Sequence, residues 1–404
     1  MGERRQGSSR MRARARELDE ARTFKVPSSC DVAVVGGGAS GLAAAIAAAK
    51  AGASAVVLEQ DLVCGRKILA TGNGRCNFAA ADLAPSAYSC PEFVAPVLGA
   101  HPADEVLAFF LECGLAWTQD ETRLYPLSRQ AASVRDVLLA RADRAGVALA
   151  CARGVQKVMP DGNGWTLAYA GEAGQGTLHA SAVILAGGGS QAASLPPQLP
   201  QVAKEPILCP LAATGLPFSR LDGRRAHGKA TLLRRGKTVA IEEGEFLFRS
   251  YGVSGIAAFN LSREAEPGDT LVLDLAPGYV ASQLARLIGL AGSAAGVADP
   301  ALAALISDLG GQDPKRMAEL LKGLSCRIEG RADMAHAQVT RGGLATSAFS
   351  PETLEADPAQ AGGHGLFACG EALDVDGPCG GYNLGWAWLS GVRAGEMAAA
   401  CSRT

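Results

Sequence analysis

The sequence predicts an α/β fold in which a Rossmann-like sheet is assembled from both ends of the chain and interrupted by inserted modules. Three observations predict it. An apolar segment, a glycine-rich turn and an alanine-rich segment follow one another at residues 31–52. A similar pattern returns at residues 365–400. Between these ends, residues 205–275 alternate apolar and polar runs, and residues 280–324 change to helical spacing.

The first element is a strand–turn–helix–strand succession. Its four segments are residues 31–35 ("DVAVV"), 36–41 ("GGGASG"), 42–52 and 54–59. This order and spacing is typical of a βαβ unit that binds a dinucleotide. The start of the helix offers free N–H groups and a positive dipole end to phosphates. We therefore expect the turn to bind the pyrophosphate of a dinucleotide cofactor.

The glycines of this turn have separate roles. Gly36 allows the tight turn, Gly38 lets the pyrophosphate approach the backbone, and Gly41 lets the helix lie close to the strand. Ala39 and Ser40 complete the expected contact.

The second strand ends in an acid. Glu59 lies 23 residues after Gly36, where a carboxylate can accept hydrogen bonds from ribose hydroxyls. Gln60 and Val155 are also assigned to the cofactor site. An acid at this place serves NAD as well as FAD, so the choice between them depends on the next segment.

That segment, "ILATGNGRCNF" at residues 68–78, is too rich in glycine and polar residues to pack as a core element. Such a loop supplies the backbone amides and the flat, close contact that an isoalloxazine ring needs. Arg66 and Lys67 precede it and place positive charge near phosphates. An ordinary surface loop has a similar composition. The expected flavin contacts are Thr71, Gly72, Asn73, Gly74, Arg75, Cys76 and Asn77.

The C-terminal part of the chain repeats the succession of strand, glycine turn and helix. A strand at 365–369 leads to a glycine turn and a helix with small residues, whose N-terminus near Gly380 can stabilise an anionic flavin edge. Asp374 can hydrogen-bond the ribityl chain. The expected contacts are Gly370, Glu371, Asp374, Gly380, Gly381, Tyr382, Asn383 and Leu384.

A third glycine turn, in "GTLHASAVILAGGGS" (176–190), follows an apolar strand. The Pro-rich residues 191–200 cannot continue it as a crossover helix. We therefore expect Ala186, Gly187 and Gly188 to close the same cofactor site, and we predict no separate nicotinamide domain.

Composition narrows the function classes. The net charge is −2, from 38 basic and 40 acidic residues, so no nucleic-acid partner is expected of the body of the chain. Eleven cysteines contain no C-x-x-C pair and only five histidines occur, so no metal site is predicted. No apolar run reaches 18 residues, and no export signal is recognised, so we expect a cytoplasmic protein without a membrane span. Residues 1–28, with seven Arg before residue 25, are expected to form a disordered basic tail.

These motifs together resemble those of the BaiN-like, or aminoacetone-oxidase-type, FAD flavoproteins, which are similar in fold to glutathione reductase. The resemblance covers the chain from about residue 30 and is carried by "VVGGGASGLAAAIAAAKAG", "GRKILATGNGRCN", "TRGGL" and "GEALDVDGPCGGYNLGWAWLSG". Arg249 and Ile256 stand where the family usually has threonine and proline.

The resemblance implies a discontinuous FAD domain of the glutathione-reductase type with two inserted modules. The predicted division is 29–200 and 339–404 for the FAD-binding domain, 201–278 and 323–338 for a β-rich insert, and 279–322 for a helical subdomain.

For the reaction, the resemblance favours hydride transfer from reduced FAD, charged by NADH or NADPH, to an activated C=C bond of a small enone, as in steroids or bile acids. Oxidation of an amine or alcohol by oxygen is the alternative, and an RNA-modifying or non-catalytic flavoprotein also stays open. Disulfide chemistry is disfavoured because Cys64 and Cys76 are twelve residues apart without a C-x-x-C motif. The candidate catalytic residues are Tyr382, Arg341 and Arg249.

Overall fold

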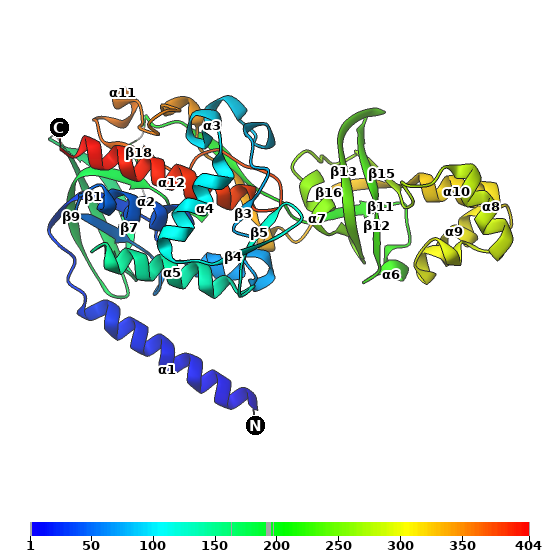
Figure 1. Cartoon of the computed structure of the whole chain (residues 1–404), viewed down its shortest axis with the longest axis horizontal. Helices are drawn as coiled ribbons and strands as arrows, with labels where there is room; N and C mark the ends of the chain where they lie inside the picture. Colours follow the sequence, from blue (N-terminus) through cyan, green and yellow to red (C-terminus); the bar gives the residue numbers. More distant parts are fainter. Residues whose placement is uncertain (1, 163, 191–194, 197, 404) are drawn as a thin grey trace. The chain divides into compact units, whose positions relative to one another are not determined.

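The computed structural model describes residues 2–162, 164–190, 195–196 and 198–403, and it divides into two compact units (Figure 1). Unit 1 consists of Met1–Glu205 and Arg341–Thr404, and unit 2 of Pro206–Thr340. Each unit has a hydrophobic core of its own. The two ends of the chain therefore fold together, and the middle folds separately.

Unit 1 is built on a seven-stranded sheet with the order β6-β2-β1-β9-β8-β7, in which β18 also pairs with β9. The strands are β1 (Ser29–Val35), β2 (Ala55–Leu58), β6 (Ala148–Ala150), β7 (Gly154–Asp161), β8 (Gly164–Gly171), β9 (Gly174–Leu185) and β18 (Leu366–Ala368). β6, β2, β1, β9 and β18 are parallel, while β7, β8 and β9 form an antiparallel meander. The long strand β9 belongs to both parts, since β8 pairs mainly with its first half and β18 with its end.

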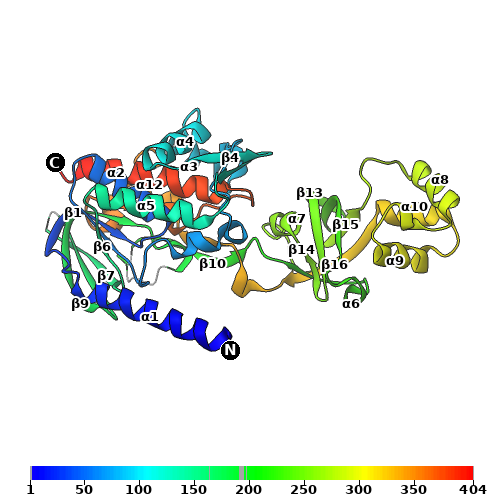
Figure 2. The ribbon, with the colours of Figure 1, turned by 60° about the horizontal axis from the view of Figure 1, so that its bottom comes forward.

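Two helices from opposite ends of the chain pack on the parallel part of the sheet. Helix α2 (Ala39–Lys50) and helix α12 (Tyr382–Cys401) lie side by side in both views (Figures 1 and 2). Their contact is lined by small residues: a Cβ atom at Gly391 or Gly395 would collide with the backbone oxygen of Ser40 or Ala44. The alanine-rich sequence of α2 is explained by this close approach.

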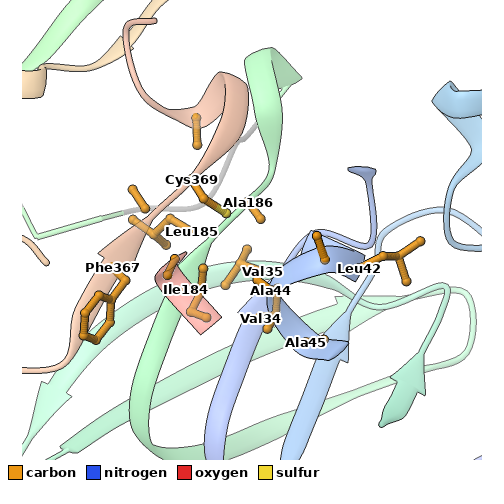
Figure 3. Packing of buried hydrophobic residues seen from close by; sticks show 14 of the residues in the cluster. Val34, Val35, Leu42, Ala44, Ala45, Ile184, Leu185, Ala186, Phe367 and Cys369 are labelled. Carbon is orange, nitrogen blue, oxygen red and sulfur yellow. The ribbon is translucent and has the colours of Figure 1, made fainter. Parts of the chain in front are cut away.

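The core beneath these helices is formed by alternate residues of the strands. Val34 of β1, Leu42 of α2 and Ile184 of β9 are fully buried, and Figure 3 shows them with Phe367 of β18. Because the parallel strands are covered by helices, they read as continuous apolar runs in the sequence.

The segment between β2 and β6 is a long crossover that the sequence analysis did not resolve. It contains the helices α3 (Pro91–Leu98), α4 (Pro102–Cys113) and α5 (Ala131–Arg144), and a small sheet of β3 (Ala79–Ala80), β5 (Arg123–Pro126) and β4 (Trp117–Asp120). The return strand β6 is only three residues long, which is why its sequence carries little signal.

Unit 2 combines a closed barrel with a helical part. The barrel order is β11-β14-β13-β12-β15-β16, with β11 (Leu211–Thr214), β12 (Arg225–Arg234), β13 (Lys237–Arg249), β14 (Gly252–Ser254), β15 (Thr270–Asp274) and β16 (Leu324–Arg331). The helices are α6 (Phe218–Leu221), α7 (Ile256–Leu261), α8 (Ala281–Ala291), α9 (Pro300–Gly310) and α10 (Pro314–Lys322). Asp299 and Asp313 cap α9 and α10, and each is followed by proline at the first helical position.

The chain passes between the units through β10 (Gln201–Ile207) and β17 (Val339–Leu344), which pair as a two-stranded sheet. The two compact units divide after residues 205 and 340, and the finer division into a β-rich insert and a helical subdomain stays a prediction.

The N-terminal segment differs from the disordered tail expected for residues 1–28. Helix α1 spans Gly2–Thr23. Arg, Glu and Ala are good helix formers, and Arg16 pairs with Glu20 one turn later at 2.9 Å. Arg14 also pairs with Glu172 at 2.6 Å. The expectation overlooked helix propensity because it considered only charge and the lack of apolar residues.

Within the described ranges, none of the helices is by itself both long and apolar enough to cross a membrane; α3 and α4, bent by 48°, meet the length and composition criteria only as a pair.

Two helical glycines test the importance of close packing. Gly395→Ala on α12 should destabilise unit 1 by about 1–3 kcal/mol, because the new methyl group would collide with Ala44 of α2. Gly289→Ala on α8, whose nearest neighbour is Pro314 at 3.9 Å, should be neutral or stabilise unit 2 by up to about 1 kcal/mol. All four tryptophans belong to unit 1, so tryptophan fluorescence during urea unfolding follows that unit, and circular dichroism follows both. Equal responses of the two variants would contradict this explanation.

Candidate cofactor-binding site

The turn between β1 and α2 is held in a conformation that only glycine permits. Gly36 has φ +103°, and a Cβ atom there would lie 2.7 Å from the carbonyl oxygen of Ala186 at the end of β9. A Cβ atom at Gly41 would collide with the oxygen of Gly36. Close packing therefore explains why glycine stands at both positions, and the turn contacts Ala186.

Gly38 differs from its neighbours because its open side meets no protein. It is the N-cap of α2 with φ −77°, and no side chain caps the helix. A Cβ atom at Gly38 would have no heavy atom of the described residues within 4 Å. Packing therefore does not require glycine at this position. A glycine there fits a backbone surface that a pyrophosphate can approach closely.

Glu59 holds the turn from the adjacent strand end. One carboxylate oxygen accepts a hydrogen bond from the amide of Gly37 at 2.6 Å, and the other accepts from the amide of Asp61 at 2.7 Å. Burial raises the pKa of Glu59, although these amides oppose the shift. The structure thus places this carboxylate beside the glycine turn, where a ribose next to the pyrophosphate would lie. Gln60 is exposed, and Val155 is buried on β7.

The loop that follows, Arg66–Gly74, consists of short 3₁₀ turns joined across a kink at Thr71–Asn73, where the backbone is not helical. Gly72, Asn73 and Gly74 all have positive φ, as does the buried Cys76. Burial raises the pKa of Cys76 to about 11, so its thiol stays protonated at neutral pH. Residues with such unusual backbone angles cluster at functional sites. A binding site therefore explains this loop better than core packing does.

The same loop carries a buried polar atom without a protein partner. Oδ1 of Asn77 is inaccessible to solvent and accepts no hydrogen bond from the described residues. A buried acceptor left unsatisfied costs about 1–3 kcal/mol unless a ligand or water supplies a donor. Together with the open face of Gly38, this acceptor fits a bound FAD, which carries N–H and hydroxyl donors.

The charged residues of this segment lie at its surface. Arg66, Lys67 and Arg75 are exposed, and Arg66 pairs with Asp61 at 3.0 Å. They can therefore reach phosphates only from the rim.

The C-terminal turn joins the first one directly. Gly370 donates its N–H to Oγ of Ser390 at 2.9 Å, and Trp386 donates to the Gly370 oxygen at 3.2 Å. A Cβ atom at Gly370 would lie 2.5 Å from Oγ of Ser40. A Cβ atom at Gly188 would lie 3.5 Å from Glu371. The turns at 36–41, 186–188 and 370–371 are thus neighbours, and their shared role in binding a cofactor stays a prediction.

The start of α12 is shaped by Asn383. Its Oδ1 accepts from Gly377, and its Nδ2 donates to the oxygens of Gly377 and Pro378. Gly380 and Gly381 both have positive φ, and a Cβ atom at Gly381 would collide with Ala79 beside the 68–78 loop. Asn383 therefore holds the loop, while the backbone of Gly380–Leu384 remains the part that can face a cofactor. Oδ1 of Asp374 accepts from the amide of Gly342 at 2.8 Å.

The candidate catalytic residues have protein partners. The Tyr382 hydroxyl donates to Asp82 at 2.9 Å. Arg341 forms two hydrogen bonds, of 2.9 and 3.1 Å, with Asp376, which is fully buried. Arg249 lies in unit 2, where its guanidinium pairs with Asp222 at 3.1 Å. None of the three needs a substrate to explain its position, and their catalytic roles stay predictions.

Two features of the site were not predicted. Asp376 is 35 residues from Arg341, and sequence spacing gives no signal for that pair. The thiol closest to Cys64 in the described chain is that of Cys151, at 3.6 Å, not that of Cys76. The described residues contain no group of three or more His, Cys, Asp or Glu that could hold a metal ion.

This fold and this site define a Rossmann-type FAD-binding flavoprotein, an FAD-dependent oxidoreductase. The chain belongs to the HI0933-like family, whose Rossmann-domain model matches residues 30–397.

The curated relatives include enzymes of two kinds. A 3-dehydro-bile acid delta(4,6)-reductase of Clostridium scindens is 33% identical, over 91% of this chain and 98% of the relative. Ribosomal RNA dihydrouridine synthases of Haemophilus influenzae and Escherichia coli are each 25% identical, over 88% and 89% of this chain and 95% and 96% of theirs.

Among solved structures, a flavocytochrome c3 fumarate reductase in its open conformation has a TM-score of 0.48 at 15% identity, covering 96% of this chain and 81% of that chain. A 3-ketosteroid-delta4-(5alpha)-dehydrogenase from Rhodococcus jostii has a TM-score of 0.46 at 15% identity, covering 93% and 98%.

The open face of Gly38 leads to a prediction that separates binding from folding. Gly38→Ala should leave the melting temperature of the apoprotein unchanged, because the new methyl group meets no protein atom and the backbone angles suit alanine. It should weaken FAD binding by at least about 10-fold, because the methyl group occupies the approach of the pyrophosphate. Flavin fluorescence titration measures the affinity, and Gly278→Ala, equally open but in unit 2, is the control. Unchanged FAD affinity in Gly38→Ala would place the pyrophosphate elsewhere.

The hydrogen-bonded pair of Arg341 and Asp376 leads to a second prediction, which concerns the stability of unit 1. Asp376→Ala should destabilise unit 1 by about 3 kcal/mol, because it leaves a partly buried guanidinium without its carboxylate. Tryptophan fluorescence during urea unfolding gives the change. Asp82→Ala, which removes only the exposed partner of Tyr382, should cost less than about 1 kcal/mol.

Proposed function

We propose that this protein reduces a C=C bond conjugated to a carbonyl group in a small organic molecule, such as a steroid- or bile-acid-like enone, with FAD recharged by NADH or NADPH. The observation that carries the proposal is the 33% identity, over almost the full length of both chains, to a 3-dehydro-bile acid delta(4,6)-reductase. This identity between the two sequences extends along one continuous match. It supports the same class of reaction for this chain as for that relative.

The residues of unit 1 have defined tasks in this proposal. Bound FAD supplies the hydride that reaches the β-carbon of the conjugated bond. The turn at Gly36–Gly41 holds the pyrophosphate, and Glu59 keeps that turn in place through the Gly37 amide. Oδ1 of Asn77 would accept a hydrogen bond from bound FAD, and the N-terminus of α12 would stabilise negative charge on the flavin.

Proton delivery is a separate task. Conjugate reduction also needs a proton at the α-carbon. Tyr382 has a hydroxyl beside the N-terminus of α12, and Asp82 orients it. It is our candidate for that step, with solvent as the other source.

A second candidate function is reduction of uridine in ribosomal RNA. Two relatives with that activity support it, and uracil also contains a C=C bond conjugated to a carbonyl. The chemistry required of the flavin site is then the same, and only the substrate differs. The small-molecule proposal is preferred because the identity is higher and because 38 basic against 40 acidic residues give no overall electrostatic attraction for RNA.

The test uses the holoprotein without oxygen. NADH or NADPH should bleach the flavin absorbance, and an α,β-unsaturated ketone, such as a 3-oxo-Δ4 steroid, should restore it with formation of the saturated ketone. Gly38→Ala supplemented with excess FAD serves as a matched variant that should recover this turnover. Saturated ketones and alkenes that lack a conjugated carbonyl group are the negative substrates.

Each other outcome points to another function. Reoxidation by unmodified ribosomal RNA with formation of dihydrouridine, and none by enones, would replace the proposal with the RNA activity. Bleaching by an amine or alcohol but not by NADH or NADPH would replace it with an oxidase.

A further inference from the structure

Two cysteines face each other beside the glycine turn of the candidate cofactor site. Cys64 follows β2, and Cys151 directly follows β6. Their sulfur atoms are 3.6 Å apart although 87 residues separate them in sequence. Both flank Glu59, whose carboxylate holds the glycine turn.

The two loops that carry these thiols are already held together by the backbone. Glu59 donates its N–H to Ala150 at 3.1 Å, Ala152 donates to Asp61 at 2.8 Å, and Arg153 donates to Glu59 at 2.7 Å. A disulfide needs the sulfur atoms at about 2.05 Å, so they must approach by only about 1.5 Å. Side-chain rotation can provide much of this movement without opening the backbone pairing.

The surroundings make the two thiols unequal. Cys64 is 2% exposed, and its side chain lies against Gly37, where a Cβ atom would collide with its sulfur. Cys151 is only partly buried, so a small oxidant reaches it first. The hydrogen bond from Cys64 lowers the pKa of Cys151, with help from the charge of Arg153, whereas the pKa of Cys64 is raised. Cys151 is thus the more accessible of the two thiols and the one whose pKa is lowered, and it is the thiolate form of a cysteine that attacks a peroxide.

We propose that Cys64 and Cys151 are a redox modification site, and that peroxide converts them into a reversible disulfide that clamps the FAD-binding turn. The Cys151 thiolate attacks one oxygen of hydrogen peroxide; the O–O bond breaks, and the other oxygen leaves as hydroxide, which takes up a proton to become water. Cys64 then attacks the sulfur of the resulting sulfenic acid. The S–S bond forms, the S–O bond breaks, and the leaving hydroxide combines with the Cys64 proton as a second water. Two thiols are thereby oxidised by two electrons in total, and one peroxide is reduced.

The disulfide acts on the cofactor through Gly37 and Glu59. Since the Cys64 side chain contacts Gly37, a link from Cys64 to Cys151 ties the turn to the end of β6 as well as to β2. Opening this end of the site then requires the two loops to move together. Oxidised protein should therefore release FAD about 10-fold more slowly, whichever substrate the enzyme reduces.

The experiment treats the purified holoprotein with one equivalent of hydrogen peroxide and blocks the remaining thiols by alkylation. We expect two of the eleven thiols to be lost, a mass decrease of two hydrogen atoms, and a cross-linked pair of peptides that contain Cys64 and Cys151. A thiol reductant should reverse all three changes. Release of FAD into an excess of another flavin-binding protein gives the rate before and after oxidation.

Variants separate this pair from the other thiols. Cys64→Ser and Cys151→Ser should each abolish the cross-link and the change in FAD release, while Cys401→Ser, a partly buried cysteine at the end of α12, should behave as the wild type. Peptide mapping of the wild type needs no variant and decides the question even if one serine variant fails to fold. A cross-link between other cysteines, or oxidation of Cys151 to sulfinic acid without a cross-link, would overturn the proposal. An unchanged release rate in fully cross-linked protein would overturn the clamp.

Discussion

The site depends on direct contact between the backbones of two helices that come from opposite ends of the chain. Gly391 and Gly395 of α12 lie against the carbonyl oxygens of Ser40 and Ala44 in α2, and neither position has room for a Cβ atom. This contact places the N-terminal regions of both helices at the same edge of the sheet. Larger residues would separate the helices, and the glycine turn of one half would no longer meet the C-terminal turn of the other.

Most polar groups at this edge are used to hold the protein itself. Glu59 binds Gly37 and Asp61, Ser390 accepts from Gly370, and Asn383 fixes the loop before α12. The backbone at Gly38 and Oδ1 of Asn77 are different, because no packing partner explains them. A site with a rigid frame and a few uncommitted groups is preorganised, so binding the cofactor does not require the frame to rearrange.

The two units of the chain carry different features of the family pattern. The cofactor-binding residues described above lie in unit 1, whereas the segment around Arg249 and Ile256, which departs from the family pattern, lies in unit 2. Relatives named for a bile acid and for ribosomal RNA both match almost the whole chain, so the match extends over both units.

The sequence by itself determined the elements whose signals are local. The strand–turn–helix pattern at 31–59, the glycine turn before α12 and the helical spacing of residues 280–324 could be predicted, because glycine turns and apolar periodicity depend on neighbouring residues rather than on distant ones. Helix α1 was within reach of the same reasoning but was missed. The tertiary structure alone decided the partners: Asp376 for Arg341, Asp82 for Tyr382 and Cys151 for Cys64. Side chains so far apart in sequence meet only because the sheet and the α2–α12 contact set their distances. Their separation along the chain therefore does not predict these contacts.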